Sequence, residues 1–407
     1  MFRLSGKIAW ASLTRRGARS ILVVLMISVS LWGLLFMEGI SDGMIEQMVS
    51  NAIRSDSGHL SLFAEGYHLD PDLSRQVTDV EAIDDFLEND KRVLSYVKRI
   101  KQDGLVATAH YSRGTKIYGI EPEEEKQHGG LDGYLFRGKF DFGPLQRGAI
   151  IGFKLADKLQ VRIGSKIILS AQDRYMEVSS VSLKVTGILK TNNMAIDEDA
   201  IFIAAKKARQ LLALSKEVSQ IAIILYDEGQ IPSLQQDLQQ EFPHFEILRW
   251  DELYPALLQS RMMMENFNLI TSLLIFCIAA LGIFGVMLVS VLERLREFGI
   301  MMAIGTRFRQ IGNIILVESF FLGFFGFGLG ALIGGGTLYY FKIYGLDLSI
   351  FSDAFNEFGM DAVTHAIIRP SYFFTALAAV IMATFLSVLI PLWLLRKAKP
   401  IETISKI

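Results

Sequence analysis

Long apolar runs alternate with polar stretches along this 407-residue chain. Four of the runs carry few or no charged residues, and each is long enough to cross about 30 Å of hydrocarbon as an α-helix. One of them contains a single acidic residue, Glu318. The pattern predicts four transmembrane helices, over residues 20–40, 266–292, 311–341 and 370–395.

Basic residues predict how these helices are oriented. They cluster in residues 1–19, 293–310 and 396–407, which all fall on one side of the membrane in a four-span arrangement. Because cytoplasmic loops carry an excess of Lys and Arg, both chain ends are predicted to be cytoplasmic. Residues 342–369 then form a short loop on the outer side.

The start of the chain allows two interpretations. The apolar core of the first span, from Ile21 to Phe36, is longer than that of a typical signal peptide, and no Ala-x-Ala cleavage site follows it. These features favour an uncleaved anchor over a cleaved signal. Residues 1–19 alternate apolar and basic side chains, which predicts an amphipathic helix on the inner membrane surface.

Residues 41–265 have a mixed pattern that predicts a large α+β domain on the outer side of the membrane. A capping-box sequence from Thr78 to Glu81 opens a helical pattern that continues as far as Val97. Pro232 is expected to open a second helix. Short apolar runs predict strands at residues 59–63, 116–120, 166–169, 181–185, 221–226 and 245–248.

An acidic run at residues 121–125 could bind a cation or a basic partner. It lacks the ligand spacing of a calcium loop, so a solvated loop is the favoured interpretation.

Composition fits membrane helices joined to a sizeable soluble domain: 51% of residues are hydrophobic, 21% are charged, and the net charge is −2. The sequence contains no phosphate-loop motif, no nucleophile-elbow motif and no histidine pair at metal-ligand spacing. A single cysteine excludes a disulfide within the chain. We therefore expect no catalytic site, no metal or cofactor bound by this chain, and no nucleic-acid partner.

The charged insert at residues 293–305 is the first candidate site. Leu295, Phe298 and Met302 are spaced to form one apolar helix face, flanked by charged residues. We expect a docking helix for a cytoplasmic partner, while a simple positive-inside loop is the alternative. The predicted docking residues are Glu293, Arg294, Arg296, Glu297, Phe298, Gly299 and Gly305.

Two further candidates lie in the spans. Gly326, Gly330 and Gly334 recur every fourth residue, so they predict a close-packing helix face, either within the chain or between two copies. In the same span, Glu318 is expected to pair with Arg307, Arg309 or water, and a proton-relay role is the less favoured alternative.

A methionine cluster marks the outer end of the second span. Methionine suits adaptable apolar surfaces, including ones that accept acyl chains, and ordinary packing at the membrane interface is an equal alternative. The predicted lipid or substrate contacts are Met262, Met263, Met264 and Phe267.

These motifs resemble a known family. Residues 293–305, read as Glu-Arg-x-Arg-Glu-Phe-Gly-Ile-x-x-Ala-Ile-Gly, are similar to the signature of the FtsX/MacB-type permeases of ABC transporters. Further similarities lie at Ser41–Met44, Gly58–Leu60, Gly148–Gly152 and Trp250–Pro255, and at the Pro400-Ile-Glu-Thr ending. Within that family, chain length and the first two of these motifs look closest to the lipoprotein-releasing permeases of the LolC/LolE type.

The resemblance implies a mechanism and partners. A separate LolD-like ATPase, which binds ATP and magnesium, would dock on residues 293–305 at the cytoplasmic face of a bacterial inner membrane. The chain would pair with a second copy or a paralogue and release lipoproteins to a periplasmic LolA-like carrier. A hairpin at residues 170–180 could contact that carrier.

Other functions remain open at this stage. A MacB-like permease for peptides, drugs or other substrates would share the same motifs. A membrane sensor with an outer ligand domain is disfavoured because the segment after the fourth span is too short for an output domain. A secondary transporter normally has more spans and more intramembrane ionisable groups.

Overall fold

The structure, a computed structural model, describes residues 17–191, 193–351 and 363–397. Most of the amphipathic helix predicted for residues 1–19, and most of the tail at 396–407, lie outside these ranges. The chain forms two compact units. One comprises residues 1–45, 261–348 and 363–407, and the other comprises residues 46–260 and 349–362.

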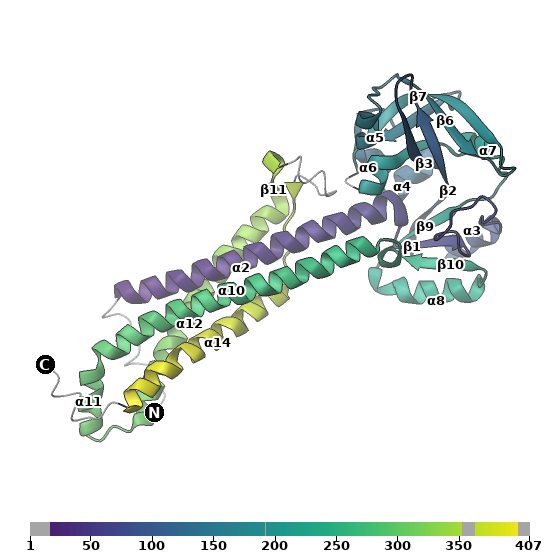
Figure 1. The fold of residues 1–407 in the computed structure, drawn as a ribbon. Helices are drawn as coiled ribbons and strands as arrows, with labels where there is room; N and C mark the ends of the chain where they lie inside the picture. Colours follow the sequence, from purple (N-terminus) through teal and green to yellow (C-terminus); the bar gives the residue numbers. More distant parts are fainter. Residues whose placement is uncertain (1–16, 192, 352–362, 398–407) are drawn as a thin grey trace. The chain divides into compact units, whose positions relative to one another are not determined.

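The first unit is built from long apolar helices, drawn in Figure 1. Among the described residues, four helices are long and apolar enough to cross a membrane. They are α2 (Gly17–Ala52), α10 (Pro255–Glu293), α12 (Phe308–Tyr344) and α14 (Pro370–Lys397). All four exceed the predicted spans, because helical hydrogen bonding continues beyond the apolar stretch.

Shorter elements connect these helices. A nine-residue helix, α11 (Leu295–Ala303), lies between α10 and α12. After α12 the chain forms a two-stranded antiparallel ladder in which Leu346 pairs with Thr364. These elements are β11 (Leu346–Asp347), the 3-10 turn η4 (Ser349–Phe351) and β12 (Val363–Thr364).

Apolar side chains from all four long helices form the core of the first unit. Ile27 of α2, Met287 of α10, Ile315 of α12 and Val388 of α14 belong to one buried cluster. A second cluster includes Leu35 and other residues of α2, α12 and α14. Because lipid is as apolar as these side chains, close packing rather than water exclusion must hold the bundle together.

The second unit contains one mixed sheet of ten strands in the order β10-β1-β9-β2-β3-β8-β5-β7-β4, with β6 paired to β2 and β7. Most neighbours are antiparallel, whereas β3–β8 and β5–β7 are parallel. The strands are β1 (Leu60–Ala64), β2 (Val93–Ala107), β3 (Ser112–Ile120), β4 (Leu135–Gly138), β5 (Gly148–Gly152), β6 (Lys166–Gln172), β7 (Val178–Leu189), β8 (Ala200–Ala204), β9 (Gln220–Leu225) and β10 (Phe245–Arg249).

Strand β2 joins the two halves of this sheet. Its first part, up to Arg99, pairs with β9, and its second part, from Ile100, pairs with β3. One core lies around β1, β9 and β10, where α3 and α8 pack (Figure 1). Other buried clusters lie around β5, β7 and β8.

The remaining helical elements of the second unit are short. They are η1, a π-helical turn (Ile53–Ser57), α3 (Val80–Asn89), α4 (Pro122–His128), η2 (Leu131–Tyr134), α5 (Phe153–Lys158), α6 (Met194–Asp199), α7 (Ala205–Leu212), η3 (Glu228–Gln230), α8 (Ile231–Glu241) and α9 (Trp250–Leu253). The predicted fold class, four membrane-spanning helices and a large α+β domain between the first and the second, is confirmed.

Two predictions for the segment from Thr78 to Val97 are wrong. The helix expected to reach Val97 ends at Asn89, because residues from Val93 onward pair with β9. Its expected cap is absent as well: Asp79 is the N-cap and makes no side-chain cap, while Glu81 pairs with Lys216. Tertiary strand pairing overrides the helical spacing of the apolar residues.

The acidic run is solvated for most of its length, but it is not a loop: from Pro122 it begins α4, with Glu121, Glu123 and Glu124 exposed. The Glu125 side chain is only 1% exposed. Glu125 accepts two hydrogen bonds, at 2.5 and 2.7 Å, from the guanidinium of Arg99, which is itself fully buried. A buried carboxylate requires such a partner, and the partner here comes from a distant strand.

Candidate functional site

The charged insert forms a helix of its own between α10 and α12. Helix α10 ends at Glu293, and Arg294 leaves helical geometry with φ −102° and ψ 7°. After α11, Gly305 has a φ of 98°, a conformation that a side chain would strain. The glycine therefore permits the turn that leads into α12.

The predicted apolar face of α11 is turned toward the chain's own helices. Phe298 is 1% exposed and packs with Val291, Ile311 and other residues of the bundle. Leu295 and Met302 are partly buried against the same cluster. Phe298 and the buried Gly299 therefore hold α11 in place and are not presented to a partner.

Ion pairs hold the two residues at the junction between α10 and α11, Glu293 and Arg294. Glu293 accepts two hydrogen bonds of 2.6 Å from the guanidinium of Arg19 at the start of α2. The next residue, Arg294, donates to Glu318 of α12 at 3.1 Å and lies 3.3 Å from Glu297. Its guanidinium also lies over the ring of Phe298, 5.0 Å from the centroid.

Glu318 is thus paired with Arg294, a partner that was not among the expected Arg307, Arg309 and water. Both side chains are largely buried, at 12% and 9% exposure. Sequence separation conceals this pair, because Arg294 lies just before α11 and Glu318 lies 24 residues further on, in α12. Arg19 was not predicted as a site residue, because it is one of several basic residues before the first span and no motif distinguishes it.

The opposite face of α11 is open. Arg296 and Glu297 are exposed, and Ile300 and Ile304 are 48% and 78% exposed. A helix that holds one face against the bundle and offers charges and isoleucines on the other has the form of a docking surface. We call Arg296, Glu297, Ile300 and Ile304 the exposed α11 face.

The three predicted packing glycines lie against α2 of the same chain. A Cβ atom at Gly326 would stand 2.6 Å from Cβ of Ile27, and one at Gly330 would stand 3.0 Å from the backbone of Ser28. At Gly334 the nearest atom, 2.7 Å away, belongs to Leu35. Ser28 also donates a hydrogen bond of 3.0 Å to the carbonyl of Gly326.

The predicted methionine cluster lies on α10. Met262, Met263 and Phe267 are 56%, 69% and 52% exposed, and Met264 is partly buried. The structure therefore leaves this apolar surface uncovered within one chain. Among the described residues, no group of three or more His, Cys, Asp or Glu side chains could hold a metal ion.

Comparison with known proteins identifies the family. Residues 20–241 match the family described as MacB-like periplasmic core domain, and residues 269–400 match FtsX-like permease C-terminal. The first match alone covers more than half of the chain. The chain belongs to the FtsX/MacB-type permeases of ABC transporters. It is therefore a multi-pass membrane protein whose large domain lies between its first two spans.

Curated relatives of this permease carry different names. It is 27% identical over 262 residues to the lipoprotein-releasing system transmembrane protein LolC of Neisseria meningitidis, a match that covers 61% of the chain and 62% of LolC. It is 25% identical to the macrolide export protein MacB of Bdellovibrio bacteriovorus, over 57% of the chain and 37% of that protein.

A third relative is the uncharacterized ABC transporter permease YknZ of Bacillus subtilis, 23% identical over 82% of the chain and 86% of YknZ. The matches to LolC and to this MacB span less than two thirds of those proteins.

Proposed function

We propose that this permease couples ATP hydrolysis by a separate cytoplasmic subunit to the release of lipoproteins from a bacterial inner membrane. ATP and magnesium bind to that subunit, and this chain transmits its conformational change to the large domain. A second copy or a paralogue completes the membrane complex, and a soluble carrier outside the membrane receives the lipoprotein.

The exposed α11 face carries the proposal of an ATPase partner. Arg294 and Phe298 fix α11 to the bundle, so a force applied to Arg296 or Ile304 reaches α10 and α12 directly. Arg19 ties the end of α10 to α2 as well. A loop that served only to set topology would need basic residues but not this seating.

Three observations support lipoprotein as the cargo. The first is the similarity to LolC. The second is the exposed methionine surface of α10, which suits acyl chains. The third is the β6–β7 hairpin, whose tip exposes Tyr175, Met176 and Val178 at 73%, 75% and 76%. An apolar tip of this kind offers a contact to a soluble carrier.

Export of another substrate is the alternative. Its support is the similarity to a protein named for macrolide export. That function would use the same α11 face and would differ only in what the outer domain and the methionine surface contact.

Docking is tested with variants that change only the exposed face. The wild-type chain, Arg296→Glu, Ile304→Asp and Lys342→Glu are purified from native membranes under identical conditions, and the recovered ATPase is quantified. Lys342 lies exposed in the last turn of α12, away from α11, and is the matched control. We expect about tenfold less ATPase with the two α11 variants and no loss with the control. Equal recovery with all four chains would overturn the docking proposal.

The cargo is tested by reconstitution. The purified complex is placed in proteoliposomes with an acylated lipoprotein or its unacylated form, and release to a soluble carrier is followed after ATP addition. We expect ATP-dependent release of the acylated protein. If the complex hydrolyses ATP and moves a macrolide in an ATP-dependent way but releases no lipoprotein, the cargo proposal is wrong and the export alternative is favoured.

A further inference from the structure

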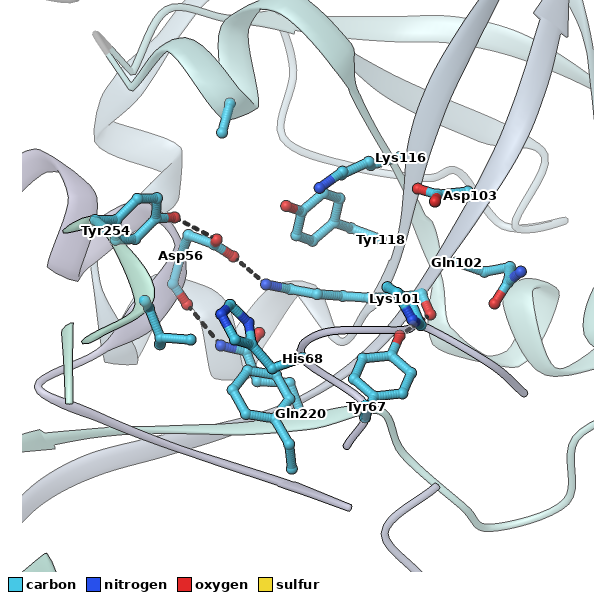
Figure 2. A pocket seen from close by; sticks show the side chains of 14 residues that line it. Asp56, Tyr67, His68, Lys101, Gln102, Asp103, Lys116, Tyr118, Gln220 and Tyr254 are labelled. Carbon is cyan, nitrogen blue, oxygen red and sulfur yellow. Dashed lines mark hydrogen bonds and ion pairs between the residues drawn. The ribbon is translucent and has the colours of Figure 1, made fainter. Parts of the chain in front are cut away.

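A cavity of about 190 Å³ with both polar and apolar lining residues lies in the second unit (Figure 2). Lys101 and Gln102 of β2, Lys116 and Tyr118 of β3, and Gln220 of β9 contribute to its lining. Its walls also include aromatic rings, among them Phe63, Tyr67 and Tyr254. Cavities that hold drug-sized molecules span about 300–1,000 Å³, so this one suits a smaller polar molecule.

Some polar groups in the cavity wall already have hydrogen-bond partners within the chain. The carboxylate of Asp56 accepts hydrogen bonds from the ammonium of Lys101 and from the hydroxyl of Tyr254, both drawn in Figure 2. Burial lowers the pKa of Lys101 to about 8, while Asp56 opposes that shift. At neutral pH this pair is therefore charged and internally balanced, and it forms one fixed side of the cavity.

The amide of Gln220 has a defined orientation. Its Nε2 donates to the backbone carbonyl of Asp56 at 3.3 Å and to the hydroxyl of Ser61 at 2.7 Å. The carbonyl of Asp56 can only accept, so the nitrogen must face it. The Oε1 atom of Gln220 then remains buried without a hydrogen-bond partner among the described residues, although the residue is only 1% exposed.

A buried acceptor without a partner is costly, so the Oε1 atom of Gln220 in the lining of this cavity indicates that the occupant donates a hydrogen bond. Gln102 lies opposite Ile117 in the register of β2 and β3, so its side chain is on the other face of the sheet from Lys101, Lys116 and Tyr118.

Unused donors lie on the neighbouring strand β3. Lys116 and Tyr118 are two residues apart, so they share one face of the strand. Neither the ammonium of Lys116 nor the hydroxyl of Tyr118 has a hydrogen-bond or ion-pair partner within the described ranges, and Figure 2 shows both side chains beside the cavity. Asp103 lies opposite Lys116 in the strand register, is exposed, and forms no ion pair with a described residue.

We propose that this cavity binds a small zwitterion of the amino-acid type. The carboxylate of the ligand lies against Lys116 and Tyr118, which supply a charge and a hydroxyl donor. Its ammonium group donates to Oε1 of Gln220, and Asp103, which lies opposite Lys116 in the strand register, adds negative charge to the lining. The aromatic rings leave room for a side chain. This soluble ligand is distinct from a membrane-anchored cargo, so the inference goes beyond the proposed function.

The test uses the full chain in lipid nanodiscs without any ATPase. Each common L-amino acid is titrated by calorimetry at up to about 10 mM, together with acetate and ethylamine, which carry only one of the two charged groups. We expect at least one amino acid to bind in a 1:1 ratio, and acetate and ethylamine to bind at least tenfold more weakly. The best amino acid should also raise the thermal midpoint of the wild-type chain.

Variants then locate the site. Lys116→Met should weaken binding about tenfold, and Gln220→Met should do so as well, whereas Lys166→Met should bind like the wild type. Lys166 is an exposed lysine of β6 outside the cavity lining and is the matched control. Because Lys116 is exposed, its loss leaves the fold intact, which circular dichroism verifies.

Three results would overturn the proposal. They are no binding of any amino acid, acetate binding as tightly as the best amino acid, or unchanged affinity in Lys116→Met. Failure of lipoprotein release in proteoliposomes would leave these binding measurements untouched, so the two proposals fail separately.

Discussion

The guanidinium of Arg294 donates a hydrogen bond of 3.1 Å to the carboxylate of Glu318, across the junction between α11 and α12. Both side chains are largely buried. Removing one member of such a pair leaves a charge without its partner in a poorly solvated site. The pair therefore decides how firmly α11 is held.

We expect Glu318→Gln to lower the free energy of unfolding by about 1–3 kcal/mol, because Arg294 loses its buried partner and keeps Glu297. Thermal unfolding of the purified chain in detergent measures this. Glu297→Gln is the control: its carboxylate is 63% exposed, so its loss should change stability by less than about 0.5 kcal/mol. Equal effects of the two substitutions would contradict the seating of α11 by Glu318.

The contact between α12 and α2 depends on glycine at position 326. Gly326→Ala should lower the unfolding temperature at a cost of about 1–3 kcal/mol, because the added carbon would stand 2.6 Å from Cβ of Ile27, an atom fixed to the backbone. Gly328→Ala is the matched control, with nothing within 4 Å of its added carbon. Helix propensity should make this control neutral or stabilising by up to about 1 kcal/mol. A larger loss for Gly328→Ala than for Gly326→Ala would refute this packing.

In the second unit, Glu125→Gln should destabilise the fold by about 3–5 kcal/mol, because Arg99 is fully buried and Glu125 is its close partner. The neighbouring Glu124 is exposed, and Glu124→Gln should be nearly neutral. Hydrogen exchange or proteolysis of the full chain would localise the loss of stability to the second unit. If Glu125→Gln and Glu124→Gln resist proteolysis and hydrogen exchange equally well, the Arg99–Glu125 pair contributes little to stability.

The pKa of Lys101, lowered by burial to about 8, predicts a pH dependence of stability. Between about pH 8 and the usual lysine pKa of about 10.4, the unfolded chain holds a proton that the folded chain has lost. Stability from this group therefore rises with pH in that window, by no more than about 1.4 kcal/mol per unit. Below the window both states are protonated and the contribution is constant.

This pH dependence is isolated by difference. The thermal midpoint of the wild type minus that of Lys101→Met is measured from pH 7 to pH 10, so that other titrating groups cancel. The difference should shift in favour of the wild type as pH rises. A flat difference would show that the burial of Lys101 does not perturb its titration.

Much of the architecture follows from local patterns. Apolar runs long enough for a bilayer identify the four spans, and alternating residues identify strands such as those at 221–226 and 245–248, which the structure forms as β9 and β10. These features depend on neighbouring residues and on the solvent they meet. The charged insert between α10 and α12 is visible for the same reason.

Local patterns in the sequence therefore predict the four spans, the large α+β domain between the first two and the position of the charged insert. The pairing of charges emerges only in the folded chain: Arg294 with Glu318, Arg19 with Glu293, and Arg99 with Glu125. It also ended the helix before Val97 by pairing that segment with β9. Apolar periodicity is a local property, whereas ion pairs and strand partners depend on segments that meet only after the chain has folded.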